Sequence, residues 1–233
     1  MFVAVQACLN GGLTRSDHSA VPQTPAELAA DAVASRNAGA FCVHLHPRDA
    51  NALESMKPRD CDAAVAAIRK AAPRLPIGLS SAELIDPDPF ARAAAILAWK
   101  TPPDFISVNI GELGWEGIAR AALRAGLQIE AGLSTPAEAH ALAAGAFAHR
   151  VLRALVEVDG GADDARAVSA LVPAGVPQLW HGLGERTWEV ISAGFSAGFD
   201  VRVGLEDTTV LADGRVAAGN AELVAAAVAL ASV

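Results

Sequence analysis

Short apolar runs alternate with longer segments of helical spacing along the whole chain. Each run has the length of one buried strand, and Ala, Leu, Arg and Glu dominate the segments between the runs. This alternation is typical of proteins with a parallel sheet. The eight predicted strands are Phe2–Cys8, Ala40–His46, Pro76–Ser80, Asp104–Val108, Leu127–Leu133, His149–Leu155, Pro177–His181 and Val201–Leu205.

Helix boundaries support the same interpretation. Thr24–Glu27 and Thr135–Glu138 each place a threonine before a proline and a glutamate three residues later, the pattern of a capping box. Eight strand-and-helix units predict the α/β class and a (β/α)8 TIM barrel over a single domain, 1–233. The alternative is an open doubly wound sheet, but Asn10–Gly11–Gly12 lacks the glycine spacing with which such sheets bind phosphate.

Composition narrows the classes of function. Apolar residues make up 52% of the chain and charged residues 19%, which predicts a packed core. The net charge of −8 argues against nucleic acid and against an anionic membrane as partners. Three cysteines without paired spacing indicate a reducing compartment. Apolar residues directly follow Met1, and no apolar run reaches the roughly 20 residues of a membrane span, so we expect a cytoplasmic protein.

His44 and His46 are the most informative polar pair. They lie at the end of a predicted strand, where side chains two residues apart point to the same face. Two imidazoles at that spacing can converge on one divalent metal ion. Considered alone, the pair would equally suit two histidines that are hydrogen-bonded near a strand end.

Further polar residues gather at the same end of the predicted strands, where barrels carry their chemistry. This distribution favours a candidate active site, because loop starts would not otherwise collect histidines, carboxylates and arginines together. Asn10, Ser80 and Asn109 are candidates for substrate binding. Arg153 and His181 are further candidates for substrate binding, and the remaining candidates are Glu130, Glu206 and Asp207, with Arg202 inside the last strand.

Glu206 can complete a metal site with the two histidines. In a closed barrel, the last strand reaches the second strand through the first. Two imidazoles and one carboxylate, with a position left for substrate, form a catalytic metal pattern. Zinc is the default expectation, although geometry decides between divalent ions. Taken alone, Glu206–Asp207 would suit a surface turn.

Two of these candidates leave alternatives open. His181 could be a third metal ligand or a substrate contact, or a neutral histidine hydrogen-bonded at a strand end. Glu130 could orient a substrate or take a proton, or it could pair with Arg153.

Four segments together resemble the β-keto acid cleavage enzymes, a family that includes the 3-keto-5-aminohexanoate cleavage proteins. The segments are Asn10–Gly12, Val21–Leu28, Gly39–Asp49 and Val201–Asp207. The resemblance implies a TIM barrel that holds a divalent metal, usually zinc, and it places the family's metal ligands on His44, His46 and Glu206.

The resemblance also implies a reaction. The family converts a β-keto acid and acetyl-CoA, its co-substrate, into acetoacetate and a new acyl-CoA, and is therefore an acyltransferase that cleaves a C–C bond. Its base is an aspartate that works with an arginine, and these correspond to Asp207 and Arg202. Glu130 matches an acidic residue that binds or orients substrate. Family members tend to assemble, so we expect a homo-oligomer.

Departures from the family bear on the substrate. This chain has Ser80–Glu83 where many members have a Thr-Gly-Gly turn, and Leu13 where members that act on amino-substituted substrates have an acidic residue. We therefore expect a neutral or apolar β-keto acid. The other classes considered are a metal-dependent hydrolase and a non-catalytic metal- or ligand-binding barrel. Such hydrolases usually add histidines on strands five and six, where this chain has Glu130 and Arg153.

Overall fold

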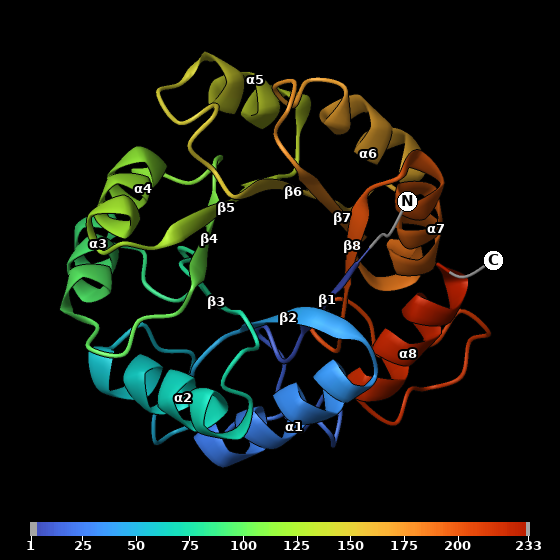
Figure 1. The fold of residues 1–233 in the computed structure, drawn as a ribbon, viewed down its shortest axis with the longest axis horizontal. Helices are drawn as coiled ribbons and strands as arrows, with labels where there is room; N and C mark the ends of the chain where they lie inside the picture. The colour runs from blue at the N-terminus through green and yellow to red at the C-terminus, as the bar shows by residue number, and fades with distance from the viewer. Residues whose placement is uncertain (1–3, 232–233) are drawn as a thin grey trace.

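A computed structural model describes residues 4–231 of the chain. Within these residues, eight parallel strands form a closed barrel in chain order, and β8 pairs with β1. Figure 1 looks along the barrel and shows the helices as a ring outside the strands. The predicted (β/α)8 TIM barrel is confirmed.

The elements follow the predicted alternation. The strands are β1 (Val5–Cys8), β2 (Ala40–Leu45), β3 (Ile77–Ser80), β4 (Phe105–Asn109), β5 (Gln128–Leu133), β6 (Arg153–Val158), β7 (Gln178–Gly182) and β8 (Asp200–Val203). The helices are α1 (Pro25–Asn37), α2 (Pro58–Ala71), α3 (Pro89–Ala98), α4 (Trp115–Arg124), α5 (Pro136–Ala144), α6 (Ala162–Ser169), the short 3-10 helix η1 (Gly184–Arg186), α7 (Thr187–Ala197) and α8 (Asn220–Leu230).

The sixth strand is the one whose predicted position is wrong. The sequence predicts His149–Leu155, whereas β6 spans Arg153–Val158. The reason is a pair of turns before the strand, in which Ala148 N–H donates to Gly145 O (3.4 Å) and Arg150 N–H to Phe147 O (2.9 Å). Arg153 is thereby the first residue of β6 and lies at the amino end of the strand. The start of the first predicted strand, at Phe2, lies outside the described residues.

The interior of the barrel is polar, in contrast to the apolar layer between strands and helices. Gln6 on β1 donates to Glu130 on β5 (3.2 Å), a contact that can only run through the interior because these strands are not neighbours. Alternation along the strands directs Ala7 and Ile129, the sequence neighbours of these two residues, outward into the core, where both are buried. The barrel therefore encloses a polar cluster.

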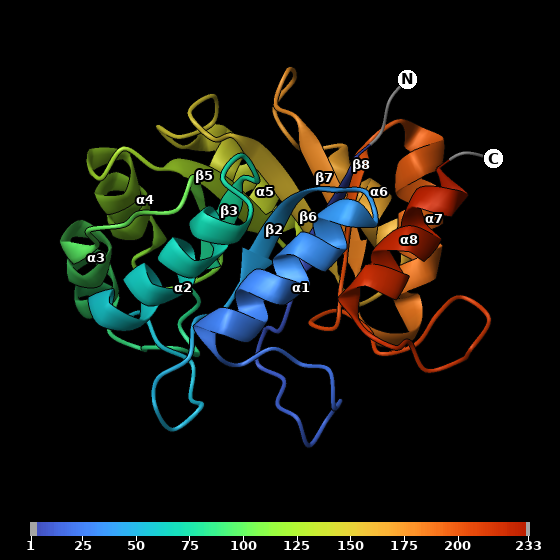
Figure 2. The same ribbon diagram turned by 60° about the horizontal axis from the view of Figure 1, so that its bottom comes forward.

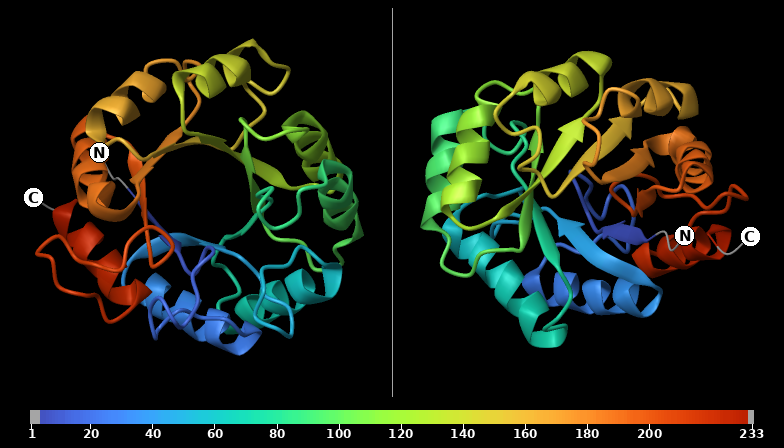
Figure 3. Two further views of the ribbon diagram at one scale, coloured as in Figure 1. Left: turned by 180° about the vertical axis from the view of Figure 1, so that it is seen from behind. Right: turned by 45° about the horizontal axis from the view of Figure 1, so that its top comes forward.

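The site is positioned by loops at one end of the barrel. Figure 2 shows the segments after β1, β2 and β8 projecting together from the same side, beyond the carboxyl ends of their strands. Figures 1 and 3 show the barrel from its two ends. None of the described helices is long and apolar enough to cross a membrane.

Candidate active site

Three side chains from two strand ends converge at the carboxyl end of the barrel. His44 is the penultimate residue of β2, His46 directly follows that strand, and Glu206 follows β8. The Nε2 atoms of His44 and His46 lie 3.8 and 3.5 Å from the two oxygens of Glu206. One ligand atom from each of the three residues lies within 4.8 Å of the other two, a spacing that one metal ion could bridge.

Each histidine is oriented by a partner on its other nitrogen. Nδ1 of His44 lies 3.2 Å from Oγ of Ser107, and that hydroxyl donates to Glu130 Oε1 (2.7 Å). Nδ1 of His46 contacts the carboxylate of Glu54. Because Ser107 Oγ can accept from Nδ1–H of His44, the Nε2 of that ring keeps a lone pair on the side of Glu206. This is how outer hydrogen bonds set the tautomer of metal-ligating histidines. His46, which the carboxylates of Glu206 and Glu54 favour as a cation, must lose its Nε2 proton to bind a metal.

The backbone around Glu206 is packed so closely that glycine is required. A Cβ on Gly11 would lie 2.3 Å from Cγ of Glu206, and Gly11 also has a φ of +47°. A Cβ on Gly204 would lie 1.8 Å from the carbonyl oxygen of Cys8. These two glycines let the ends of β1 and β8 approach, which brings Glu206 towards β2.

Two asparagines hold the same strand ends. Asn10 accepts from His46 N–H (2.9 Å) and donates to His46 O (2.8 Å) and to Pro22 O (3.1 Å). The side-chain NH₂ group of Asn10 therefore donates to main-chain carbonyl oxygens. Asn220 accepts from Leu205 N–H (2.7 Å) and donates to Leu9 O (2.8 Å). Both residues position metal-ligand candidates through the main chain.

Arg202 and Asp207 form a buried ion pair beside Glu206. Nε and Nη2 of Arg202 donate to Oδ1 of Asp207 at 3.2 and 3.0 Å, and Nη2 also donates to Glu206. Oδ2 of Asp207 and Oε2 of Glu206 are buried without a hydrogen-bond partner in the part of the chain that the structure describes. Buried polar atoms rarely lack partners, so these two oxygens mark where a ligand is expected.

His181 is fully buried and lies between two carboxylates. Its Nε2 is 3.1 Å from Glu157 Oε2 and its Nδ1 is 3.5 Å from Asp207 Oδ1. Neither contact has the alignment of a hydrogen bond. The structure thus places this residue behind Asp207, and His181 does not line the cavity described next.

A cavity of about 180 Å³ lies in front of the three converging side chains. Ser80 and Asn109, both predicted for substrate binding, line it, together with Ser107 and Arg202. Glu157 and the apolar side chains of Leu155 and Leu84 complete the wall. Its volume suits a small acid rather than a molecule of cofactor size.

Glu130 and Arg153 lie deeper in the barrel and pair with each other. Arg153 Nε donates to Glu130 Oε2 at 2.6 Å, and the two residues are register partners on β5 and β6. The guanidinium lies 4.9 Å from the centre of the Phe105 ring. Neither residue lines the cavity. Of the two alternatives for Glu130, the structure shows the ion pair.

The charges at the site have distinct physical causes. Burial lowers the pKa of His44 to about 4 and keeps the imidazole neutral, as metal ligation requires. Burial also opposes a charge on His46, but the carboxylates of Glu206 and Glu54 outweigh it and raise its pKa to about 9. Burial raises the pKa of Asp207, although the neighbouring Arg202 opposes that rise.

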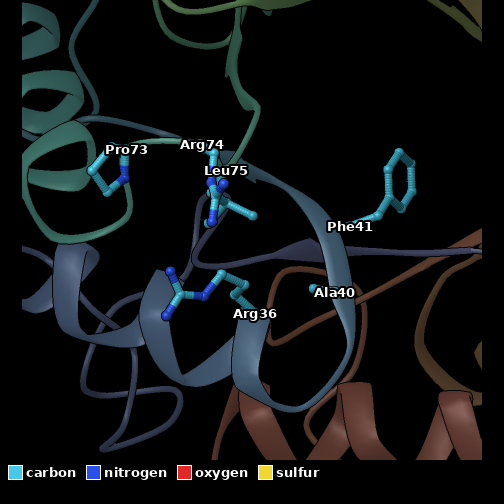
Figure 4. A pocket seen from close by; sticks show the side chains of 6 residues that line it. All are labelled: Arg36, Ala40, Phe41, Pro73, Arg74 and Leu75. Atoms are coloured by element: carbon cyan, nitrogen blue, oxygen red, sulfur yellow. The ribbon is translucent and has the colours of Figure 1, made fainter.

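A larger hollow of about 550 Å³ lies at the other end of the barrel (Figure 4). Its lining includes Ala40, the first residue of β2, and Arg36 at the end of α1. None of the residues predicted for catalysis, substrate binding or metal binding lines it. Size therefore does not identify the site; the convergence of side chains does.

Sequence reasoning missed two residues that shape the site. Glu54 contacts His46 from a loop, where no periodic pattern marks it. Asn220 lies on the outer ring and acts through hydrogen bonds to main-chain atoms.

The donor set fits a divalent metal. Two imidazole nitrogens face one carboxylate, and a carboxylate oxygen is buried with no partner within residues 4–231. The charge of the Arg202 guanidinium outweighs burial and holds the pKa of Glu206 well below its usual range, so the group is an anion. Fold and site together define a TIM-barrel protein with a candidate metal centre at the carboxyl ends of its strands.

The sequence matches the family model described as "BKACE: beta-keto acid cleavage enzyme" over residues 3–233. The chain belongs to the β-keto acid cleavage enzyme family.

Solved structures show the same fold. The apo structure of ObcA matches with a TM-score of 0.69 and 19% identity over 88% of this chain and 60% of that one. The ternary complex of ObcA with a C4-CoA adduct and oxalate matches with a TM-score of 0.70 and 18% identity, over 88% of this chain and 62% of that chain. The chain thus spans about three fifths of ObcA. 3-Hexulose-6-phosphate synthase from Salmonella typhimurium matches with a TM-score of 0.58 and 15% identity over 99% of both chains.

Proposed function

We propose that the protein is a metal-dependent β-keto acid cleavage enzyme that converts a β-keto acid and acetyl-CoA into acetoacetate and a new acyl-CoA. The observation that carries the proposal is the convergence of His44, His46 and Glu206 on a small cavity. Family membership supplies the reaction class. ObcA, which has been solved with oxaloacetate and with a C4-CoA adduct, supports a keto acid and a CoA thioester as substrates.

His44, His46 and Glu206 would hold the metal, for which zinc is the best-fitting ion given two imidazoles and one carboxylate. When bound, the metal supplies Lewis-acid polarisation of the keto acid's oxygens. Oδ2 of Asp207 accepts the proton from C2 of the β-keto acid; Arg202 donates to the other oxygen, Oδ1. Because burial raises the pKa of Asp207, its carboxylate is a stronger base than an ordinary aspartate.

C2 then attacks the thioester carbonyl of acetyl-CoA and expels CoA as a thiolate. The thiolate adds to the keto carbon of the original acid, the bond between that carbon and C2 breaks, and return of the proton from Asp207 to C2 releases acetoacetate beside the new acyl-CoA. Ser80 and Asn109 offer hydrogen bonds to the small acid in the cavity. A volume of about 180 Å³ leaves the CoA chain outside. The protein works as a cytoplasmic homo-oligomer in this proposal.

The test is to incubate zinc-loaded protein with a panel of β-keto acids and acetyl-CoA, and to measure acetoacetate and the new acyl-CoA. Formation of both products in equal amounts is expected for at least one acid. No turnover across the panel would contradict the proposal. Hydrolysis of esters or amides without CoA would favour the hydrolase instead.

A further inference from the structure

The segment that follows β7 makes hydrogen bonds to the main chain of Asp207. Gly184 N–H, just beyond β7, donates to the carbonyl oxygen of Asp207 (2.8 Å). The hydroxyl of Thr187 donates to Gly182 O (3.0 Å) and lies 3.5 Å from the same Asp207 carbonyl. Thr187 is fully buried, so these contacts are shielded from water. The segment therefore fixes the backbone that carries the proposed base.

The side chain of His181 reaches the same residue from β7 itself. Each of its ring nitrogens faces a carboxylate, Nδ1 the Oδ1 atom of Asp207 and Nε2 the Oε2 atom of Glu157. The ring is fully buried and neither nitrogen has another partner in the described structure. The ring lies close enough that a small rotation would align Nδ1–H with Oδ1 of Asp207, 3.5 Å away, while Nε2 faces Glu157 at 3.1 Å.

These contacts leave the two oxygens of Asp207 unequal. Oδ1 receives two N–H groups of Arg202 and faces Nδ1 of His181. Oδ2 is buried and has no partner among residues 4–231. Oδ1 is thus held by the two hydrogen bonds of Arg202 and has the His181 ring beside it at 3.5 Å, which limits rotation of the carboxylate and keeps Oδ2 in a fixed direction.

We propose that His181 is a positioning residue, which together with Arg202 holds Oδ1 of Asp207 so that Oδ2 remains the proton acceptor. The inference rests on the proposed function, since it assigns a support to the proposed base. It moves His181 from a substrate contact or metal ligand to a residue that acts through Asp207. Glu157 then both contacts the His181 ring and lines the cavity.

Two substitutions of His181 test the roles of its two ring nitrogens separately. The amide nitrogen of asparagine falls near the position of Nδ1, and that of glutamine near Nε2. His181→Asn therefore keeps a donor towards Asp207, and His181→Gln keeps one towards Glu157. His149→Gln, at an exposed position, is the matched control.

The assay measures by NMR how fast zinc-loaded protein exchanges the C2 hydrogens of acetoacetate for deuterium in D₂O. The exchange rate without enzyme is subtracted. Acetoacetate is a product of the proposed reaction whichever β-keto acid is used, so the assay does not require the acyl group of the substrate to be known. We expect His181→Gln to slow exchange about 10- to 100-fold, the scale of a misplaced catalytic group. His181→Asn should recover most of the rate, and His149→Gln should match wild type. Bound zinc per chain, measured by mass spectrometry, should be unchanged in all three.

The outcomes separate this inference from the proposed function. Exchange by wild type with equal rates in His181→Gln and His181→Asn would overturn the positioning role and leave the proposed function standing. No exchange by wild type would overturn both. If His181→Gln does not fold, Glu157→Gln replaces it, with an expected loss of several-fold in kcat; an unchanged kcat in that variant would also contradict the inference.

Discussion

The barrel holds two buried clusters of charge that differ in one respect. In the lower cluster (Gln6, Ser107, Glu130 and Arg153), both oxygens of Glu130 accept hydrogen bonds. In the upper cluster (His181, Arg202, Glu206 and Asp207), one oxygen of each carboxylate and both nitrogens of His181 have no hydrogen-bond partner among the described residues. Most side chains in both clusters are buried, so burial alone does not tell the clusters apart.

The difference separates structural charge from functional charge. A buried carboxylate whose two oxygens both accept hydrogen bonds, such as Glu130, leaves no free acceptor for a ligand. Buried oxygens without partners carry a desolvation cost that a metal or a substrate can relieve. The two clusters also touch, because Ser107 links Glu130 of the lower cluster to His44 beside the upper one. The lower cluster therefore supports the metal-site candidates from below.

The largest expected effect is loss of metal from the site formed by His44, His46 and Glu206. His46→Ala leaves one imidazole and one carboxylate, which hold a labile divalent ion poorly, so we expect less than about a tenth of the wild-type zinc after dialysis. The measurement is zinc per chain by mass spectrometry. His149→Ala, at an exposed position, is the control and should keep the wild-type content. Full zinc in His46→Ala would show that the ion binds elsewhere.

The next effect is on catalysis without loss of metal. Asp207→Asn removes the proposed base but keeps an oxygen for Arg202, so kcat should fall about 1000-fold while zinc content is unchanged. The free energy of unfolding should fall, but by less than the roughly 3–5 kcal/mol of a fully broken buried ion pair, because the buried Arg202 loses the charge of Asp207 and keeps that of Glu206. Steady-state kinetics and urea unfolding test both points, and retained activity would reject the assignment of the base.

The lower cluster should respond in the opposite way. Arg153→Met leaves the buried carboxylate of Glu130 without its cation, which should cost about 3–5 kcal/mol in the free energy of unfolding. The double variant Arg153→Met, Glu130→Gln should recover much of that loss, because the uncompensated charge is gone. Urea unfolding at neutral pH measures both. Equal stability of the single variant and wild type would remove the distinction between the clusters.

The smallest effect concerns a carboxyl outside the barrel. Burial raises the pKa of Asp31 from 3.8 to about 6, and Asn220, which donates to it at 2.6 Å, only partly opposes this rise. The folded chain therefore binds this proton more tightly than the unfolded chain. Stability from this group is full below pH 3.8 and is lost as the pH rises through about 6.

Asp31→Asn keeps an acceptor for Asn220 without the charge. The variant should be about 2 kcal/mol more stable than wild type at pH 8 and no more stable at pH 3.5. Urea midpoints at the two pH values test this sign. A variant that is less stable at pH 8 would contradict it.

The sequence contained enough to predict the barrel and the three converging residues. Alternating strands and helices define the closed sheet, and strand parity aligns His44 with His46. Closure then brings the segment after β8 beside β2. Each of these steps depends on a regular repeat, which is what a sequence displays most clearly.

The remaining features depend on irregular structure. The turns that precede β6 displaced that strand and moved Arg153 from the expected loop end to the amino end of the barrel. Glu54 reaches His46 from a loop, and Asn220 acts on the main chain from α8. Such contacts join positions far apart in sequence and leave no periodic signal, so they required the fold.

The central claim is that His44, His46 and Glu206 together hold one divalent ion. X-ray absorption of the zinc-loaded protein tests it directly, because the first shell reports the ligand atoms. The account predicts two imidazole nitrogens and oxygen at about 2.0–2.2 Å, with no sulfur. A sulfur shell at about 2.3 Å, which would indicate Cys8 or Cys42 of the barrel, or a shell without imidazole, would contradict it.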